Sequence, residues 1–305
     1  CVIFFNLRVP TKKRKNFVSV YFDTLLASFS LIKGPIAKNV SVHIVMGSPN
    51  TVLPIIRAGT GFPSCPAAPS ALETKTFHLY NEKISYILCV LENGHLGQLY
   101  FGKRLHDKAD FSYLVEKCER PMTSYIYEWD RTFSLEHIRQ EYPVYGTTDY
   151  RHPAIELLQE NGSRISEFQY ESYEIIAGKP KLSGLPATYT ESEEEAQTLR
   201  IFLKDALNGA KLALLYTIFD EYSAIARSAY IENAGEKNLH VLNMMSLSLD
   251  LSDKDYEWMQ LSGAWSRERY IKNRTLEQGI TAIDSMRGNS SHEHNPFLAL
   301  ERHNT

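Results

Sequence analysis

The chain has 305 residues, of which 43% are hydrophobic and 23% charged, a balance that is ordinary for a globular protein with a sizeable core. Its 33 Lys and Arg against 36 Asp and Glu leave a net charge of -3, which gives no electrostatic reason to expect binding to nucleic acid or to a membrane. The four cysteines, at positions 1, 65, 89 and 118, form no CxxC pair and have no zinc-ligand spacing. We therefore expect free thiols, no metal site and a reducing, cytoplasmic location.

Residues 1–72 differ in character from the rest of the chain. The sequence begins with Cys1, and a basic run at 11–15 precedes an apolar run at 17–32 that imitates a signal peptide. Asp23 interrupts this run, which is also shorter than the roughly 20 apolar residues that span a bilayer. Prolines crowd the stretch from 49 to 69 and disfavour regular structure there. We predict an irregular or unrelated leader at 1–72 and one domain at 73–305.

From residue 75 onward, hydrophobic and polar residues alternate with a period of two. The alternation at 84–90 is followed by Asn93-Gly94, which predicts a hairpin because both residues tolerate positive φ, and by a return strand at 96–101. The pattern recurs at the four stretches 199–203, 212–218, 225–231 and 239–251. Such a meander is typical of an antiparallel sandwich or barrel. We predict an all-β, mainly antiparallel fold.

Helical signals are weak throughout the chain. Residues 135–142, after Ser134, are the best candidate for a short helix. The alternating strands and helices of a (β/α)₈ barrel are absent from the sequence. The sequence therefore predicts strands with a few short helices and no such barrel.

Three polar clusters have both a chemical and a plain structural interpretation. The carboxylates between 250 and 257 suggest a paired-carboxylate site, but we interpret them as turn chemistry at a strand end. His292 and His294 lack a third ligand, and neighbouring strand residues point to opposite faces, so no metal is predicted. The acidic run at 191–195 is interpreted as a solvated turn.

Four segments carry a recognisable set of motifs. They are DRTFSLE at 130–136 leading into QEYPVYGTTDYRHPA at 140–154, the stretch 173–189 with GKPKLSGLPATY, LSGAWSRER at 261–269, and SSH with NPF at 290–297. Together they resemble the N-terminal domain of glycoside hydrolase family 36, the bacterial α-galactosidases of the raffinose and melibiose pathways. The resemblance covers about residues 76–300.

The resemblance implies a β-supersandwich that precedes a catalytic (β/α)₈ barrel and a small C-terminal β domain. Family members hydrolyse terminal α-galactosides with retention, using two Asp residues on the barrel. Because this chain ends before the barrel would begin, the resemblance implies no catalytic residue, no cofactor and no hydrolysis by this chain alone. It also implies an α-galactoside oligosaccharide as ligand of the full-length enzyme and a homo-oligomer, which is a tetramer in the family.

In the family, this domain lies against the barrel, and one of its loops helps to close a neighbouring subunit's substrate pocket. Alignment on DRTF places the family's acidic and arginine positions at Glu119 and Arg131, although the acidic position is commonly Asp. A carboxylate accepts hydrogen bonds from sugar hydroxyls and a guanidinium donates to them. The other interpretation of Arg131 is a surface ion pair with Asp130, Glu128 or Glu136.

Two further sites are open to interpretation. Trp265 stands beside Arg267 and is either a stacking platform for sugar or a core or interface residue. We interpret Asp149, Arg151 and His152 as residues that fix a buried loop through hydrogen bonds rather than touch substrate.

Three functions follow from these observations. The first is the N-terminal domain of a truncated α-galactosidase, which serves assembly and the rim of the substrate pocket without catalysis. The alternative is a free-standing carbohydrate-binding β-sandwich. A third is mutarotase-like chemistry, which needs a His and a Glu acting as acid and base on one sheet face, and the residue spacing does not assemble that pair.

Overall fold

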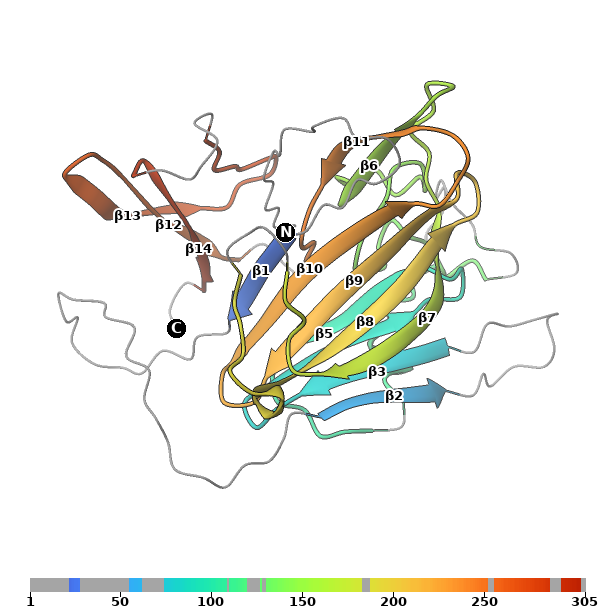
Figure 1. Cartoon of the computed structure of the whole chain (residues 1–305), viewed down its shortest axis with the longest axis horizontal. Helices are drawn as coiled ribbons and strands as arrows, with labels where there is room; N and C mark the ends of the chain where they lie inside the picture. The colour runs from blue at the N-terminus through green and yellow to red at the C-terminus, as the bar shows by residue number, and fades with distance from the viewer. Residues whose placement is uncertain are drawn as a thin grey trace.

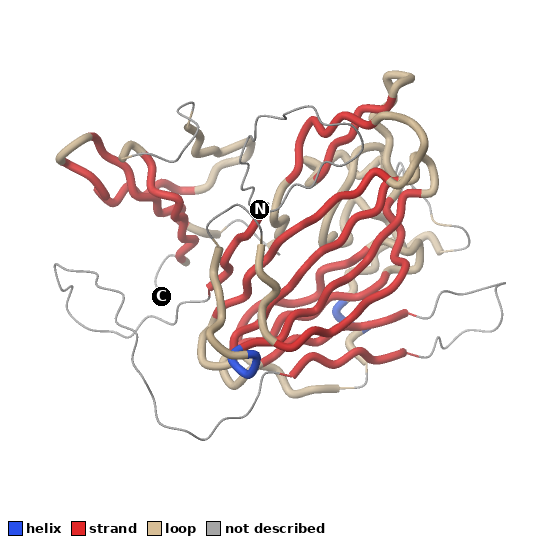
Figure 2. Tube along the Cα trace, viewed as in Figure 1, coloured by secondary structure: helices blue, strands red, loops and turns tan. Residues whose placement is uncertain are grey.

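A computed structural model of the chain describes residues 22–27, 55–61, 74–108, 110–119, 127, 130–182, 187–251, 255–285 and 292–302. Across these residues the fold is all-β, and its helical content is two short 3₁₀ turns, η1 (Ser112–Leu114) and η2 (Glu193–Glu195). Every strand pair within the four sheets is antiparallel. The predicted fold class is confirmed (Figures 1 and 2).

Two sheets stack face to face to form a sandwich (Figure 1). The four-stranded sheet has the order β2 (Ile55–Gly61), β3 (Thr74–Tyr80), β4 (Ile84–Val90) and β5 (Leu96–Lys103). The five-stranded sheet has the order β1 (Phe22–Ala27), β10 (Ala224–Asn233), β9 (Ala210–Phe219), β8 (Ala196–Asp205) and β7 (Phe168–Ala177). The strands predicted at 84–90, 96–101, 199–203, 212–218 and 225–231 lie within these two sheets. The stretch predicted at 239–251 forms a strand only at its start, as β11 (Leu239–Met244).

The main hydrophobic core lies between the two sheets. On β9, Leu212, Leu214, Tyr216 and Ile218 belong to this core and are at most 1% exposed. They pack with residues of the opposite sheet such as Tyr86, which is fully buried. Because successive strand residues point to opposite faces, the period of two in the sequence places every second side chain here. Each such Leu or Ile contributes about 1.5–3 kcal/mol by leaving water.

The predicted turn at Asn93-Gly94 and a second turn at Gly209 connect neighbouring strands. Gly94, after β4, has φ +84°, and Gly209, between β8 and β9, has φ +77°. A Cβ atom on Gly209 would lie 2.8 Å from the Cα of Gly235, so that turn also needs a residue without a side chain.

A second, smaller core covers the outer face of the four-stranded sheet. It joins Ile87, Cys89 and Leu99 of the sheet to side chains from the long irregular segment that follows β5, namely Phe111, Phe133, Leu135 and Ile138. Burial raises the pKa of the Cys89 thiol to about 12, so this free cysteine stays protonated. The irregular segment is thereby packed against the sandwich.

The helix predicted at 135–142 is wrong. The structure has a single turn there, closed by a hydrogen bond from the Ile138 N–H to the Ser134 carbonyl at 3.1 Å. The backbone then leaves the turn to pair with β5, since Gln98 N donates to Arg139 O at 3.0 Å and Glu141 N donates to Leu96 O at 2.9 Å. Bonds to the neighbouring strand therefore replace those that a helix would have made.

Two small sheets complete the described fold. β11 pairs with β6 (Ile155–Gln159) beside the sandwich. The other sheet has the order β13 (Arg267–Thr275), β12 (Glu257–Ala264) and β14 (His294–Glu301), and it projects from the sandwich in Figure 1. Every residue of β13 is exposed, so this sheet has one strand with no covering layer among the described residues.

Two strands from the N-terminal stretch lie at sheet edges. β1 pairs with β10, and β2 pairs with β3. Most of 1–72 lies outside the described residues, so the leader and its boundary stay a prediction. In the part of the chain that the structure describes, no helix is long and apolar enough to cross a membrane.

Candidate functional site

The segments that carry Glu119 and Arg131 lie side by side. The Cys118 N–H donates to the Thr132 carbonyl at 3.2 Å, and Lys117 Nζ bonds Asp130 Oδ2 at 2.9 Å. Glu119 and Arg131 are both exposed. The structure therefore brings the two segments together and leaves both candidate side chains on the surface.

Lys117, two residues before Glu119, forms an ionic clamp with the carboxylates of Asp130 and Glu92. Its ammonium group also bonds Glu92 Oε1 at 2.5 Å, in the turn after β4. Tyr127 Oη donates to the carbonyl of Glu92 at 3.0 Å. Burial alone would raise the pKa of Asp130, but hydrogen bonds from Thr132 and the charge of Lys117 lower it to about 2. The clamp is thus fully charged at neutral pH.

The alternative interpretation of Arg131, an ion pair with Asp130, competes with the hydrogen bonds that Asp130 already makes. The Asp130 carboxylate is already bonded to Lys117 and to the backbone N–H and hydroxyl of Thr132, at 2.8 and 2.5 Å. Within the described residues no ion pair involves Arg131, and Glu128 lies outside them.

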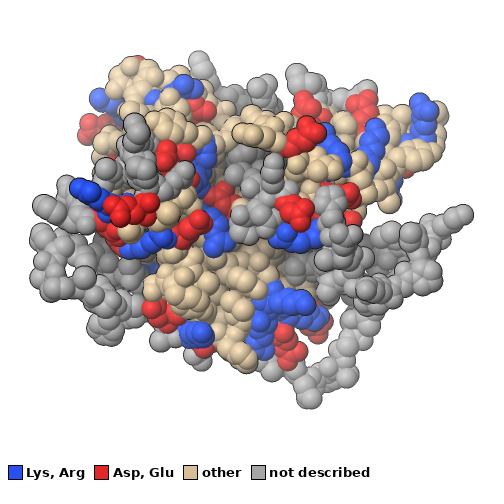
Figure 3. Space-filling view, turned by 180° about the vertical axis from the view of Figure 1, so that it is seen from behind, with Lys and Arg blue, Asp and Glu red and all other residues tan. Residues whose placement is uncertain are grey.

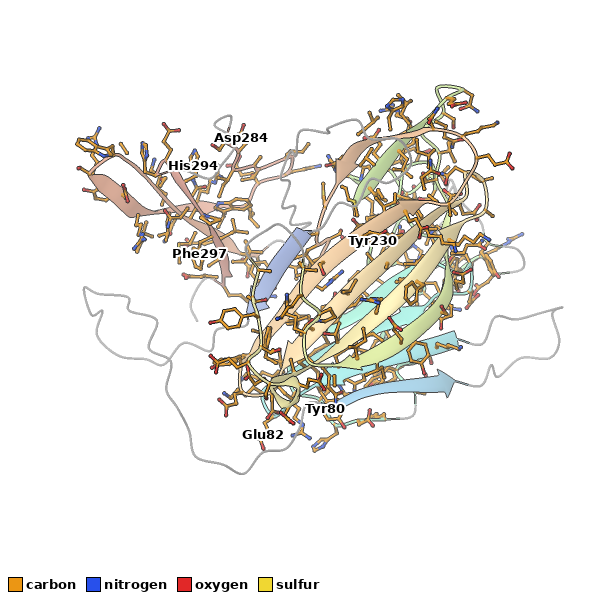
Figure 4. All side chains as sticks on the ribbon, viewed as in Figure 1. Tyr80, Glu82, Tyr230, Asp284, His294 and Phe297 are labelled. Carbon is orange, nitrogen blue, oxygen red and sulfur yellow. The ribbon has the colours of Figure 1, made fainter. Side chains whose placement is uncertain are left out.

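Trp265, the third candidate, belongs to a different part of the molecule. It occupies the tight turn between β12 and β13, where Ser266 has φ +62°, and its side chain is 79% exposed. This hairpin projects from the sandwich (Figure 1), whereas Phe133 and Leu135, which follow Arg131, pack on the four-stranded sheet. Its neighbour β14 carries His294 and Phe297, labelled in Figure 4.

Arg151 ties the loop after Arg131 to the rest of the domain. Its Nε lies 2.9 Å from Asp149 Oδ2, and its Nη1 bonds Asp250. Its Nη2 donates to the carbonyls of Leu135 at 2.6 Å and Ile138 at 3.0 Å. Asp149 and Arg151 thus fix a loop through hydrogen bonds, as interpreted from the sequence. The Asp250 interpretation as simple turn chemistry misses this ion pair.

The backbone around Asp149 is strained. Thr148 has φ +58° and Tyr150 has φ +55°, a backbone conformation that residues other than glycine rarely adopt. Each such residue costs on the order of 1–3 kcal/mol and persists only where its surroundings fix it. Here Asp149 is fixed by Arg151, by Gln140 Nε2 at 2.6 Å and by Thr147 Oγ1 at 3.1 Å. His152, by contrast, is exposed, and its Nδ1 lies 3.1 Å from the Pro153 carbonyl.

A buried ion pair joins the same loop to the main core. Arg227 Nη1 lies 2.6 Å from Glu141 Oε1, and both side chains are at most 1% exposed. Tyr86 Oη donates to Glu141 Oε2 at 2.7 Å, and the guanidinium lies 4.0 Å from the centre of the Tyr216 ring. Burial raises the pKa of Glu141 while Arg227 opposes the rise. Sequence reasoning missed this pair, although Arg227 stands at a core-facing position in the alternation of β10.

A hydrogen-bonded row of Ser, His and Asp also occurs, but a substrate cannot reach its serine. His78 Nδ1 lies 3.0 Å from Asp107 Oδ1, and its Nε2 lies 2.9 Å from Ser85 Oγ. Ser85 is fully buried, and its hydroxyl accepts the Leu105 N–H at 2.9 Å. A nucleophile must reach a substrate, so this row holds the segment after β5 in place instead.

The outer face of the five-stranded sheet carries a shallow groove of about 230 Å³. Its lining includes the rings of Phe202 and Tyr230 and the cations Arg200 and Lys181, and Figure 4 shows Tyr230 on this face. Arg200 Nη1 donates to Glu174 Oε1 at 2.6 Å. Aromatic rings beside an oriented guanidinium suit a sugar ring with its hydroxyls.

The described residues contain no cluster of three or more His, Cys, Asp and Glu side chains able to hold a metal ion. On the face seen in Figure 3, Lys and Arg side chains lie among Asp and Glu side chains.

Comparisons with known proteins relate the chain to one family. Residues 94–305 match the family model of the glycosyl hydrolase family 36 N-terminal domain. The chain is 44% identical over 228 residues to alpha-galactosidase AgaA of Geobacillus stearothermophilus, covering 75% of this chain and 31% of that protein. It is 38% identical over 237 residues to alpha-galactosidase Mel36A of Lactobacillus acidophilus, covering 76% and 32%. The chain thus spans about a third of the length of these relatives.

Solved structures show the same likeness. The crystal structure of AgaA matches with a TM-score of 0.71, over 75% of this chain and 32% of that chain, and an AgaA variant with two substitutions has been solved in complex with raffinose. The alpha-galactosidase of Lactobacillus brevis matches with a TM-score of 0.73 at 37% identity, over 75% and 31%. The chain therefore belongs to glycosyl hydrolase family 36, and residues 94–305 are its N-terminal domain.

Proposed function

We propose that this chain serves as the N-terminal domain of an α-galactosidase, where it builds subunit contacts and the outer rim of the sugar pocket and does not itself hydrolyse substrate. The observation that carries the proposal is the pairing of the Glu119 and Arg131 segments over the Lys117 clamp. The relatives' names as alpha-galactosidases and the raffinose complex of AgaA support an α-galactoside as the ligand.

The chemistry of the pair suits neighbouring sugar hydroxyls. The Arg131 guanidinium offers planar N–H donors, and the Glu119 carboxylate offers acceptors, so adjacent hydroxyls can be bonded in both directions. Because Lys117 and Arg151 hold the supporting backbone, little conformational freedom is lost when the sugar binds. Two exposed side chains on a fixed support form a rim rather than an enclosed pocket.

The projecting sheet supports the assembly part of the proposal. Trp265, Tyr270, Ile271 and Phe297 are between 36% and 79% exposed on its strands and turn. Tyr270 and Ile271 are consecutive on β13, so the sheet presents large exposed side chains on both faces. Exposed apolar side chains on a projecting element favour a protein contact. We propose a homo-oligomer, which sedimentation velocity would report as a mass above 34.9 kDa.

Titration with raffinose tests the rim directly. Calorimetry with the wild type and Arg131→Ala should show a dissociation constant at least about tenfold higher in the variant, because a charged hydrogen bond contributes about 1.5–3 kcal/mol. Lys211→Ala, which removes an exposed cation at the start of β9, serves as the matched control and should bind as the wild type does. Equal affinity of the Arg131→Ala variant and the wild type would refute the rim. Hydrolysis of p-nitrophenyl α-galactoside above the buffer rate would refute the non-catalytic role.

The alternative is a free-standing carbohydrate-binding sandwich, favoured by the groove at Tyr230 and Phe202. In that case Tyr230→Ala would weaken raffinose binding while Arg131→Ala would not. The same titration therefore separates the two functions.

A further inference from the structure

Tyr150 presents its ring to solvent between two anchored neighbours. Its side chain is 80% exposed, while the side chains of Asp149 and Arg151 are only 4% and 13% exposed. Both neighbours take part in the ion-pair network described above. The ring therefore stands out from a fixed stretch of backbone rather than from a loose loop.

The conformation that presents this ring is unfavourable for a tyrosine. Its φ of +55° lies in the left-handed region, where Asn or Gly is far better tolerated. The same is true of Thr148 at +58°, whose Cβ is branched. Tyr at this position contributes nothing to backbone stability, which points to a role for the exposed ring.

The support of Tyr150 is shared with Arg131. Arg151, the residue after Tyr150, donates to the carbonyls of Leu135 and Ile138, in the turn that begins three residues after Arg131. The ring of Tyr145, five residues earlier, is already in contact with a cation, since the Arg164 guanidinium lies 4.8 Å from its centre. Tyr150 thus offers an uncovered ring next to the supports of the proposed rim.

We propose that Tyr150 is a sugar-contacting residue, whose ring stacks on the apolar C–H face of a pyranose while Arg131 bonds its hydroxyls. This inference rests on the proposed function and extends its site by one residue. A flat, amphipathic ring of this kind contributes contact area with few torsions to immobilise. The ligand class is an α-galactoside oligosaccharide with at least one exposed apolar ring face.

The test uses the full chain and raffinose as the probe. Tyr150→Ala should raise the dissociation constant about tenfold, and Tyr150→Phe should bind within about threefold of the wild type because it keeps the ring. Tyr189→Ala removes a tyrosine that is 75% exposed in another loop and should leave binding unchanged. Tyr150→Asn should lose binding as Tyr150→Ala does, while its melting temperature equals or exceeds that of the wild type because Asn tolerates the left-handed conformation.

The outcomes distinguish a wrong role for Tyr150 from a wrong proposed function. If Arg131→Ala weakens binding and Tyr150→Ala does not, the role of Tyr150 is wrong and the proposed function stands. If the wild type shows no saturable binding, both fall. If Tyr150→Asn melts well below the wild type, the ring serves the fold and the inference falls. If Tyr150→Ala changes the sedimenting mass but not the affinity, the ring is a protein contact and the inference is again overturned.

Discussion

The irregular segment from 104 to 152 and the sheet β12–β14 contrast sharply in how they are held. The described residues of the segment form almost no regular secondary structure, yet their side chains reach the main core through Glu141 and the smaller core through Phe133 and Leu135. The sheet consists of three hydrogen-bonded strands, yet all of β13 is exposed. Regular hydrogen bonding and anchoring to the core are therefore separate properties, and the candidate rim lies in the anchored segment.

The projecting sheet has only a small internal network. Trp258 Nε1 donates to Gln260 Oε1 at 2.9 Å, and Arg274 Nη2 donates to the same oxygen at 2.8 Å. Beyond it, Ile271 and Trp265 remain 63% and 79% exposed. The contrast predicts that substitutions in the anchored segment disturb folding, whereas those in the sheet disturb association.

The largest effect is expected at the buried ion pair. Arg227→Met should lower the free energy of unfolding by about 3–5 kcal/mol, because it leaves the Glu141 carboxylate buried without its partner. Urea unfolding followed by tyrosine and tryptophan fluorescence measures this loss.

The double variant Arg227→Met with Glu141→Leu is the control. It removes both charges, so it should recover more than half of the loss. Additive losses from the two single variants would show that the segment is not anchored through this pair.

A somewhat smaller effect is expected from His95, which lies buried in the turn after β4. Burial lowers its pKa from 6.5 to about 4. As pH falls, the unfolded chain protonates His95 before the folded protein does. The stabilisation that comes from keeping His95 neutral is therefore fully present above pH 6.5 and is lost as pH falls toward 4. The free energy of unfolding decreases by about 3 kcal/mol over this range. Unfolding curves at pH 7 and pH 4.5 for the wild type and His95→Gln should show a smaller acid loss in the variant, and an identical loss would contradict this assignment.

The smallest effect is expected in the projecting sheet. Ile271→Ala should change the free energy of unfolding by less than about 0.5 kcal/mol, since the side chain is 63% exposed. Leu214→Ala, at a fully buried position in β9, is the matched comparison and should cost about 2–5 kcal/mol. Thermal melts at concentrations where sedimentation velocity reports a monomer measure both, and comparable losses would mean that Ile271 is covered within the monomer.

Much of the sandwich was predictable from the sequence because alternation and turn chemistry are local signals. Asn93-Gly94 and the alternation of β9 and β10 directly indicate hairpins and a buried face. The helix expected at 135–142 failed because the backbone there bonds to β5, a partner about forty residues away in sequence. β13 gave no alternation signal because it buries neither face.

The candidate site was only partly predictable. Glu119 and Arg131 came from the family resemblance, and no spacing rule would have joined their segments, since the segments meet through the Cys118–Thr132 and Lys117–Asp130 hydrogen bonds. The alternation around Arg227 contained a signal, a charged residue at a core position, that pointed to a buried partner. The strain at Tyr150 left no signal in the sequence, because its positive φ is imposed by tertiary hydrogen bonds of its neighbours.

Mapping raffinose onto the backbone by amide chemical shifts tests the central claim most directly. The account predicts saturable shifts in the segments around Glu119, Arg131 and Tyr150, with none along β12 and β13. Shifts confined to the Tyr230 groove, or no saturable shift anywhere, would contradict it.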